Sequence, residues 1–139
     1  MDKALNYLSL ARKGGMAELG EEPVGAITRA GKGYLVLVAS DASDHTWRRA
    51  KSFVAGTEQQ RIRVKFTKDE LGFVIGRTSL AIAAITDVQL ALAMVNALGE
   101  PEKYKAAIEV LTQKSQKAKK RQAEAKAHKR NVRMGKVKK

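Results

Sequence analysis

The sequence predicts an α/β protein, a three-layer α/β/α sandwich with a mixed sheet of about four strands, followed by a basic C-terminal tail that is helical or disordered. Two observations support this prediction. Short apolar runs rich in β-branched residues alternate along the chain with segments of helical periodicity, and glycines separate most of them. Strands that alternate with helices form a sheet that is covered by helices on both faces.

The N-terminal half contains two expected strands and three expected helices. Residues 34–40, YLVLVAS, form a continuous apolar run, as a strand covered on both faces should. In the helix that follows Gly20, Ala26 and Ile27 are expected to face the core. In order, we expect a helix from residue 4 to the Gly14–Gly15 pair, an extended segment at 16–19, a helix from 20 to 31, a strand at 34–40 and a helix that Ser43 caps.

The C-terminal half repeats this pattern and then changes in composition. Thr67 is followed by Glu70 three residues later, which is the capping-box pattern at the start of a helix. We place a domain at residues 1–99, and a C-terminal helix with a lysine- and arginine-rich tail at 100–139. In order, we expect a strand at 62–66, a helix at 67–76, a strand at 80–85, a helix at 87–98 and, after a break at 99–101, an amphipathic helix at 102–111.

The formal net charge is +13, and most of it lies in the tail. Residues 112–139 contain 12 Lys and Arg against one acid, whereas residues 1–111 contain 15 basic and 13 acidic residues. Such a tail has too little apolar surface to fold alone, so it is a frayed helix or disordered until bound. Its partners are polyanions: RNA, DNA or an anionic membrane face. No Trp or Phe lies beside the charges, which argues against a membrane helix. A tail that serves only solubility is the alternative.

The sequence offers little to a catalytic or metal site. It has no cysteine and two histidines, His45 and His128, neither with a second ligand at metal spacing. It contains no glycine-rich phosphate-binding motif. Asp69 and Glu70 lie in the first turn of a helix, where capping accounts for them. We therefore expect no enzymatic activity, no catalytic residue, no bound metal and no cofactor.

The hydropathy pattern predicts neither a targeting segment nor a membrane span. Residues 1–15 lack a long uncharged apolar stretch, so we expect no signal peptide or anchor there. The longest nearly uncharged run, residues 78–98, is interrupted by Asp87 and is expected to form a strand and a helix. Together with the absence of cysteine, these features predict a cytoplasmic protein.

Five short strings occur in an order and at distances that resemble a known family. The chain resembles the ribosomal-protein family that includes the L-seven-Ae, L-thirty-e and Gadd-type kink-turn RNA-binding proteins, and in particular its bacterial YlxQ-like branch. The resemblance covers residues 4 to about 98. No string is specific alone, and the resemblance rests on their succession. The strings are LARKGG, LGEEPVGAITRAGK, YLVLVASDAS, KDELGFVIG and AIAAITD.

The resemblance implies an α/β/α fold that binds RNA, typically a kink-turn, with two segments. The first is the N-terminus of the second helix, here the Gly-Glu-Glu at residues 20–22, where free N–H groups meet phosphate and a carboxylate accepts from a guanine edge. The second is the loop before the last strand, here residues 76–79. The chain departs from the family's Asn-Glu pair and following Lys: the Asn position holds Glu21 or Glu22, and the Lys position holds Gly25 or Ala26.

We expect phosphate contacts from basic residues that flank this segment in sequence and from the tail. Solvated surface charge is the alternative for the former, and stabilisation of the helix dipole is the alternative for the two glutamates. Trp47 and Phe53, at helical spacing, are expected in the core. The expected RNA-binding residues are Arg12, Lys13, Gly20, Glu21, Glu22, Arg29, Lys32, Arg77, Thr78 and Ser79. The expected tail contacts are Lys117, Lys119, Lys120, Arg121, Lys129, Arg130 and Arg133.

These observations predict a non-catalytic, ribosome-associated RNA-binding protein. We expect ribosomal RNA and ribosomal proteins as partners, no membrane partner and a monomer. The alternative is a protein–protein adaptor or assembly factor whose nucleic-acid affinity lies only in the tail. An exposed apolar patch with acidic potential around Gly20 would favour the adaptor, and basic potential there would favour RNA binding.

Overall fold

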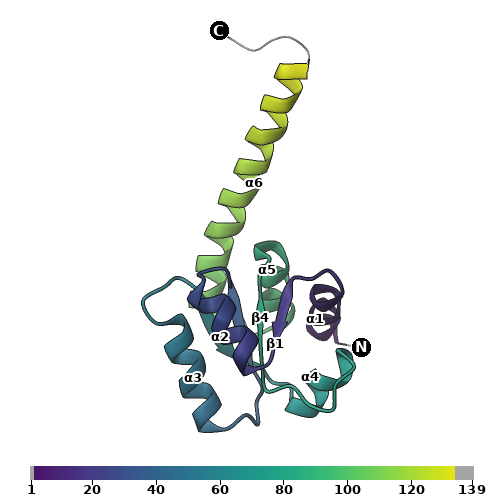
Figure 1. Ribbon diagram of the computed structural model, residues 1–139, viewed down its shortest axis with the longest axis vertical. Helices are drawn as coiled ribbons and strands as arrows, with labels where there is room; N and C mark the ends of the chain where they lie inside the picture. Colours follow the sequence, from purple (N-terminus) through teal and green to yellow (C-terminus); the bar gives the residue numbers. More distant parts are fainter. Residues whose placement is uncertain (1, 134–139) are drawn as a thin grey trace.

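A computed structural model describes residues 2–133, with side chains described as far as residue 129 (Figure 1). It confirms the predicted fold class, because a mixed four-stranded sheet lies between two layers of helices. The strands are β1 (Ala17–Leu19), β2 (Leu35–Val38), β3 (Gln60–Arg63) and β4 (Ile82–Ile85). The helices are α1 (Lys3–Lys13), α2 (Glu21–Arg29), α3 (Asp44–Val54), α4 (Lys68–Val74), α5 (Val88–Ala97) and α6 (Lys105–Arg133).

The sheet has the strand order β1-β4-β2-β3. Strand β4 runs antiparallel to both β1 and β2, whereas β2 and β3 are parallel. Every residue of β2 and β4 is buried, as a strand covered on both faces requires. Edge strand β3 begins two residues before the predicted 62–66 segment, because its pairing with β2 starts at Gln60, opposite Leu35.

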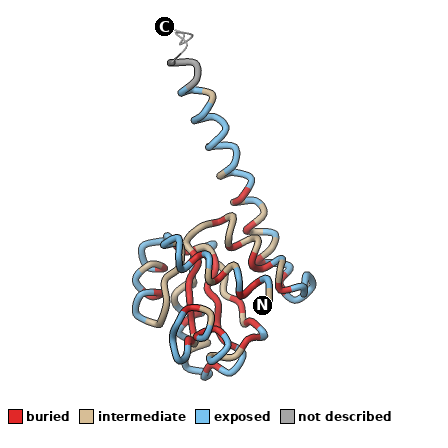
Figure 2. Tube along the Cα trace, turned by 90° about the vertical axis from the view of Figure 1, so that its right-hand side faces the viewer, coloured by how far each residue is buried: buried red, intermediate tan, exposed pale blue. Residues whose placement is uncertain are grey.

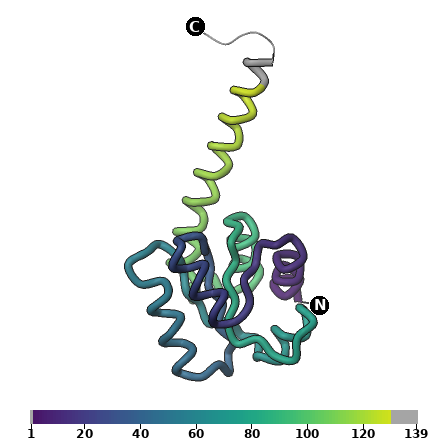
Figure 3. The backbone as a smooth tube through the Cα atoms, viewed as in Figure 1, coloured from purple at the N-terminus to yellow at the C-terminus, as the bar shows by residue number. Residues whose placement is uncertain are grey.

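Two helical layers cover the sheet. Helices α2 and α3 contact each other and one face of the sheet, and α1, α5 and α6 form the opposite layer, with α4 beside α1 (Figure 3). The core joins both layers through side chains that are almost fully buried, among them Leu8, Val24, Leu37, Leu71 and Met94. Because the helices pack against the sheet in this way, the start of α2 lies at the same end of the sheet as the start of β4.

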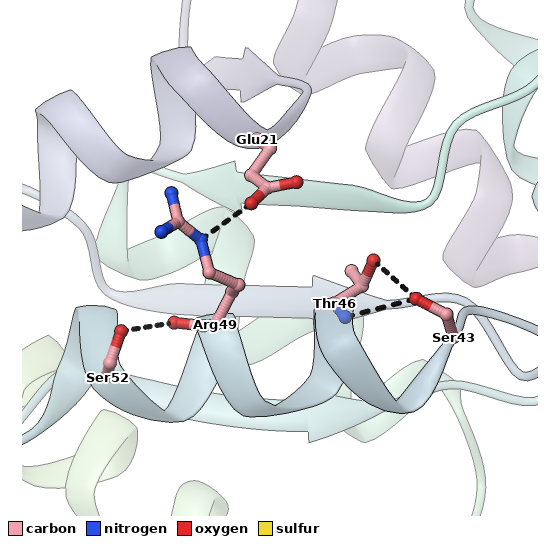
Figure 4. Close-up of polar contacts among 5 residues, drawn as sticks. All are labelled: Glu21, Ser43, Thr46, Arg49 and Ser52. Carbon is pink, nitrogen blue, oxygen red and sulfur yellow. Dashed lines mark hydrogen bonds and ion pairs between the residues drawn. The ribbon is translucent and has the colours of Figure 1, made fainter.

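The predicted helix caps are present. The Ser43 hydroxyl accepts from the Thr46 amide at 3.2 Å (Figure 4), and Thr67 and Glu70 form the reciprocal capping box. Asp87 accepts from the Leu90 amide at 2.9 Å. Of helices α1 to α5, only α2 begins without a side-chain cap, because its N-cap residue is glycine.

The inward face of α2 differs from the prediction by one position. Ala26 is exposed, whereas Val24, Gly25 and Thr28 are buried. The reason is the packing of α3, since a Cβ placed on Gly25 would lie 3.1 Å from two ring atoms of Phe53. The glycine therefore turns toward α3 and leaves the alanine in solvent.

Helix α6 extends well beyond the predicted 102–111 segment and continues without interruption to Arg133. Its first turns belong to the core, because Ala107 and Leu111 are buried, as is Tyr104 directly before the helix. Beyond Ser115 the helix projects from the globule and is almost entirely exposed (Figure 2). Lys, Arg, Gln, Glu and Ala are strong helix formers, and a docked first segment removes the cost of helix nucleation.

We expect Leu111→Ala to destabilise the whole globule, since Leu111 is fully buried between α6 and the core. Truncation of a buried leucine costs about 2–5 kcal/mol. Urea unfolding measures the loss, with exposed Gln113→Ala on the same helix as the control. Equal stability of the two variants would show that α6 does not belong to the folded unit.

Among the helices of residues 2–133, none combines the length and the apolar character that crossing a bilayer requires. The same residues contain no group of three or more His, Asp or Glu side chains placed to hold a metal ion. His45 is exposed in the first turn of α3, and His128 is exposed on α6.

Candidate nucleic-acid interface

Two segments that the sequence analysis assigned to RNA binding meet at one end of the sheet. The Gly20 amide donates to the carbonyl of Ile82, the first residue of β4, at 3.0 Å. The loop at 76–79 leads into the same strand. A Cβ placed on Gly20 would lie 3.9 Å from Nη1 of Arg77, so this guanidinium lies directly beside the N-terminus of α2.

Gly20 adopts a backbone conformation that only glycine tolerates well. Its φ of 96° and ψ of 164° lie in a region from which other residues are essentially absent. This conformation turns the chain from β1 into α2 within one residue. It also leaves the Glu21 and Glu22 amides at the start of α2 without a side-chain cap and without a Cβ in front of them, whereas Pro23, the third residue, has no N–H.

The loop at 76–79 is held against α4. The Arg77 amide donates to the Gly72 carbonyl at 2.9 Å, and the Leu80 amide donates to the Lys68 carbonyl at 2.9 Å. Gly72 lies under the loop, and a Cβ there would lie 2.6 Å from the Cα of Ser79. The loop backbone is therefore fixed, while the side chains of Arg77, Thr78 and Ser79 stay exposed.

Glu21 does not present a free carboxylate, because Arg49 of α3 binds it. The Nε of Arg49 lies 2.6 Å from Oε1 of Glu21 (Figure 4). The same guanidinium lies 5.3 Å from the centroid of the half-buried Phe53 ring. Arg49 is 28 residues away from Glu21, and nothing in the sequence indicates that they meet. We refer to Gly20, Glu21, Arg49 and Arg77 as the Gly20 corner.

Arg29 and Glu22 flank this corner. A Cβ placed on Gly25 would lie 3.0 Å from Nη1 of Arg29, so the guanidinium lies over Gly25. This is the position where the kink-turn-binding family carries lysine. Gly25 is buried against Phe53 and leaves no room for a lysine. Glu22 is exposed in the first turn of α2, and no ion pair is formed by it within the described residues.

Arg12, Lys13 and Lys32 lie at the opposite end of the sheet. The chain after α1 joins the last part of β4, where the Thr86 amide donates to the Met16 carbonyl at 2.9 Å. The chain after α2 reaches the same place, where the Tyr34 amide donates to the Ile85 carbonyl at 2.9 Å. The three cations are exposed there and do not join the Gly20 corner.

The tail leaves the globule at this second end. Lys114 lies 3.6 Å from Glu58, and both line a cleft of about 230 Å³ together with Gly31, Gly33 and Tyr34. The exposed cations of the projecting helix are Lys117, Lys119, Lys120, Arg121, Lys126 and Lys129. Because successive residues of a helix are about 100° apart, these charges lie on all sides of α6. The side chains of Arg130 and Arg133 lie outside the described residues.

Phe73 on α4 is 80% exposed, and the sequence analysis did not identify it. It lines a groove of about 410 Å³ together with the apolar Leu5 and Val74. Asp2, Asp69 and Glu70 line the same groove and make it acidic. The helical period of α4 could have placed Phe73 outside the buried Leu71–Gly72 face, since it follows them on the solvent side.

Asp41 and Trp47 serve the structure around the corner. Oδ1 of Asp41 accepts from the Lys68 amide at 2.8 Å, which ties the turn after β2 to the start of α4. Trp47 is half-buried against the core, and the guanidinium of Arg61 lies over its ring. The predicted core position of Trp47 is therefore only partly enclosed.

The chain is similar to known proteins in fold. No protein-family model and no curated protein sequence matches the chain. A solved structure of a protein of unknown function from Bacillus halodurans is similar over 72% of this chain and 100% of its own length, with a TM-score of 0.66 and 24% identity. The 15.5kD RNA binding protein of Giardia lamblia is similar over 70% of this chain and 83% of its own, with a TM-score of 0.52 and 19% identity. The chain shares its α/β/α fold with both proteins.

Proposed function

We propose that this protein is a non-catalytic RNA-binding protein that holds a bent, kink-turn-like RNA at the Gly20 corner and uses α6 for additional phosphate contacts. The observation that carries the proposal is the meeting of Gly20 and Arg77, which brings an uncapped helix N-terminus and an exposed guanidinium together across 57 positions of sequence. The shared fold with the Giardia lamblia RNA binding protein supports it.

The chemistry of the corner suits an RNA bend. Uncapped amides at the start of α2 can donate to a phosphate, and glycine lets the backbone approach closely. Arg77 supplies a planar, permanently charged donor on the other side. Because Arg49 neutralises Glu21, Glu22 remains as the carboxylate that accepts from a guanine edge in an open or bulged pair.

The position of α6 adds a second contact at the far end of the globule. Cations on all sides of a helix suit a groove between phosphate backbones better than a flat surface. An RNA that contacts both the Gly20 corner and α6 must extend along the molecule. We propose ribosomal RNA in the cytoplasm as this partner, with the monomer acting beside ribosomal proteins. The YlxQ-like assignment is part of this proposal and rests on the succession of the five strings in the sequence.

The test is the Arg77→Gln variant of the full-length chain. We expect it to lose on the order of 1–3 kcal/mol of preference for a kink-turn RNA over a straight duplex, because one specific contact is removed. Binding to the duplex should change little. Lys3→Gln removes the same charge from an exposed site on α1, in the opposite helical layer, and is the control. A parallel loss on both RNAs would contradict selection at the corner.

The acidic, apolar groove around Phe73 favours one second candidate function, that of a protein–protein adaptor. Ribosome co-sedimentation separates the two functions. If the groove carries the association, Phe73→Ser abolishes it while Arg77→Gln leaves it intact. RNA binding at the Gly20 corner predicts that Arg77→Gln weakens the association while Phe73→Ser leaves it intact.

A further inference from the structure

Edge strand β3 carries two arginines on the side that faces α3. Arg61 and Arg63 are two residues apart and therefore point to the same face of the sheet. Their guanidinium carbons lie 3.5 Å and 4.8 Å from the ring centroid of Trp47. Trp47 is the only tryptophan of the chain.

Hydrogen bonds to backbone carbonyls hold both guanidinium groups in place. Nη1 of Arg61 donates to the Trp47 carbonyl at 2.9 Å, and Nη1 of Arg63 donates to the Ser40 carbonyl at 3.1 Å. The Tyr104 hydroxyl donates to the Arg63 carbonyl at 2.8 Å and fixes the strand beneath. Each arginine has five N–H donors, so these contacts leave several unused. The pair is preorganised before any ligand arrives.

Among the described side chains, the two positive charges have no acidic partner. The ion pairs among the described residues involve Arg49, Lys65 and Lys114, and neither arginine of the pair has a carboxylate within 4.0 Å there. Burial, and to a lesser extent the charge of Arg63, lowers the pKa of Arg61. Like charges side by side on a strand are unfavourable. A bound anion would relieve this repulsion and accept from the unused N–H groups.

The pair lies within reach of the Gly20 corner. Gly20 bonds to Ile82, and Val38 pairs in register with both Ile82 and Arg63, so all four residues form one row across the sheet. Adjacent strands are about 4.8 Å apart, which places Arg63 roughly 14 Å from Gly20. Both lie at the end of the sheet opposite to the one where α6 projects from the globule.

We infer that Arg61, Trp47 and Arg63 form a second anion site, which binds a backbone phosphate of the RNA held at the Gly20 corner. The inference rests on the proposed function and adds to it a contact on β3 and α3. Arg61 and Arg63 supply charge-assisted hydrogen bonds to the phosphate oxygens, and Trp47 keeps the two planar groups side by side.

The test uses the full-length chain and the same kink-turn RNA across a salt series. Each lost phosphate contact reduces the slope of log K against log salt by about 0.7–0.9. We therefore expect Arg61→Gln with Arg63→Gln to reduce this slope by about 1.4–1.8, with lower affinity at low salt. Lys3→Gln with Lys13→Gln removes the same charge from two exposed positions of α1, in the layer opposite to α3, and is the control. Equal slopes in the two double variants would overturn the inference.

Trp47 fluorescence of the wild-type protein is a second readout that does not depend on how the variants fold. RNA binding at the pair should change the emission of the single tryptophan, and an unchanged emission at saturation would overturn the inference. The same emission is measured with inorganic phosphate, and with chloride at equal ionic strength, to test whether the site binds a free anion. Should phosphate alter the emission while RNA does not, the site would take small anions and not the RNA backbone.

The two proposals fail in different ways. If the wild-type protein shows no preference for the kinked RNA, the Gly20 corner is not the RNA site. If the wild-type protein prefers the kinked RNA, but the Arg61→Gln, Arg63→Gln variant has the same slope of log K against log salt as the control variant, only the second anion site is wrong.

Discussion

Replacing the six exposed cations of α6 with glutamine is expected to weaken binding to every RNA and to flatten its salt dependence. A protein with six phosphate contacts loses about a thousandfold in affinity between 50 and 200 mM salt. Without the cations, the slope of log K against log salt should fall by up to about 5 on a duplex. The residues to replace are Lys117, Lys119, Lys120, Arg121, Lys126 and Lys129.

Helicity and selectivity serve as internal controls for this variant. Glutamine has nearly the helix propensity of lysine and arginine, so far-UV circular dichroism should be unchanged. The Gly20 corner lies at the other end of the globule, so the ratio of affinities for kinked and straight RNA should also be retained. A slope equal to that of the wild-type protein would show that α6 makes no phosphate contacts.

Gly72→Ala is expected to disturb both stability and selective binding. The added Cβ would lie 2.6 Å from the Cα and 2.8 Å from the amide nitrogen of Ser79, and 2.9 Å from the Arg77 carbonyl oxygen. These are backbone atoms, so the loop must move and Arg77 moves with it. Overpacking costs about 1–3 kcal/mol, which outweighs the gain of about 1 kcal/mol from alanine in a helix.

Urea unfolding and binding to the kink-turn RNA measure the two effects of Gly72→Ala. Phe73→Ala changes the next residue of α4 at an 80% exposed position and is the control. We expect the control to keep its stability within about 0.5 kcal/mol and to keep its RNA preference. A stable Gly72→Ala variant with an unchanged preference would show that the loop position does not matter for recognition.

Local signals in the sequence were sufficient to predict most of the fold. The capping box at Thr67, the cap at Ser43 and the apolar run of β2 are set by neighbouring residues, and all three are present. The continuation of α6 could not be predicted from the composition of the tail alone. Its helix depends on the docking of Tyr104 and Leu111, which is a tertiary contact.

The candidate site was predictable only in part. Gly20 and the loop at 76–79 were expected to act together, and the structure places them side by side. The ion pair of Glu21 with Arg49 joins residues 28 positions apart on different helices, so no local pattern reveals it. Closeness in sequence was misleading for Lys13, because strand β1 separates the end of α1 from Gly20 by the length of the sheet.

The most direct test of selection at the Gly20 corner is the affinity of the full-length protein for a kink-turn RNA and for a straight duplex of equal length, measured across a salt series. The account predicts that binding to the duplex disappears as salt rises, because α6 supplies it through counterion release. Binding to the kinked RNA should persist, since the helix N-terminus and Arg77 read its shape. Equal affinity for both RNAs at every salt concentration would contradict selection at the Gly20 corner.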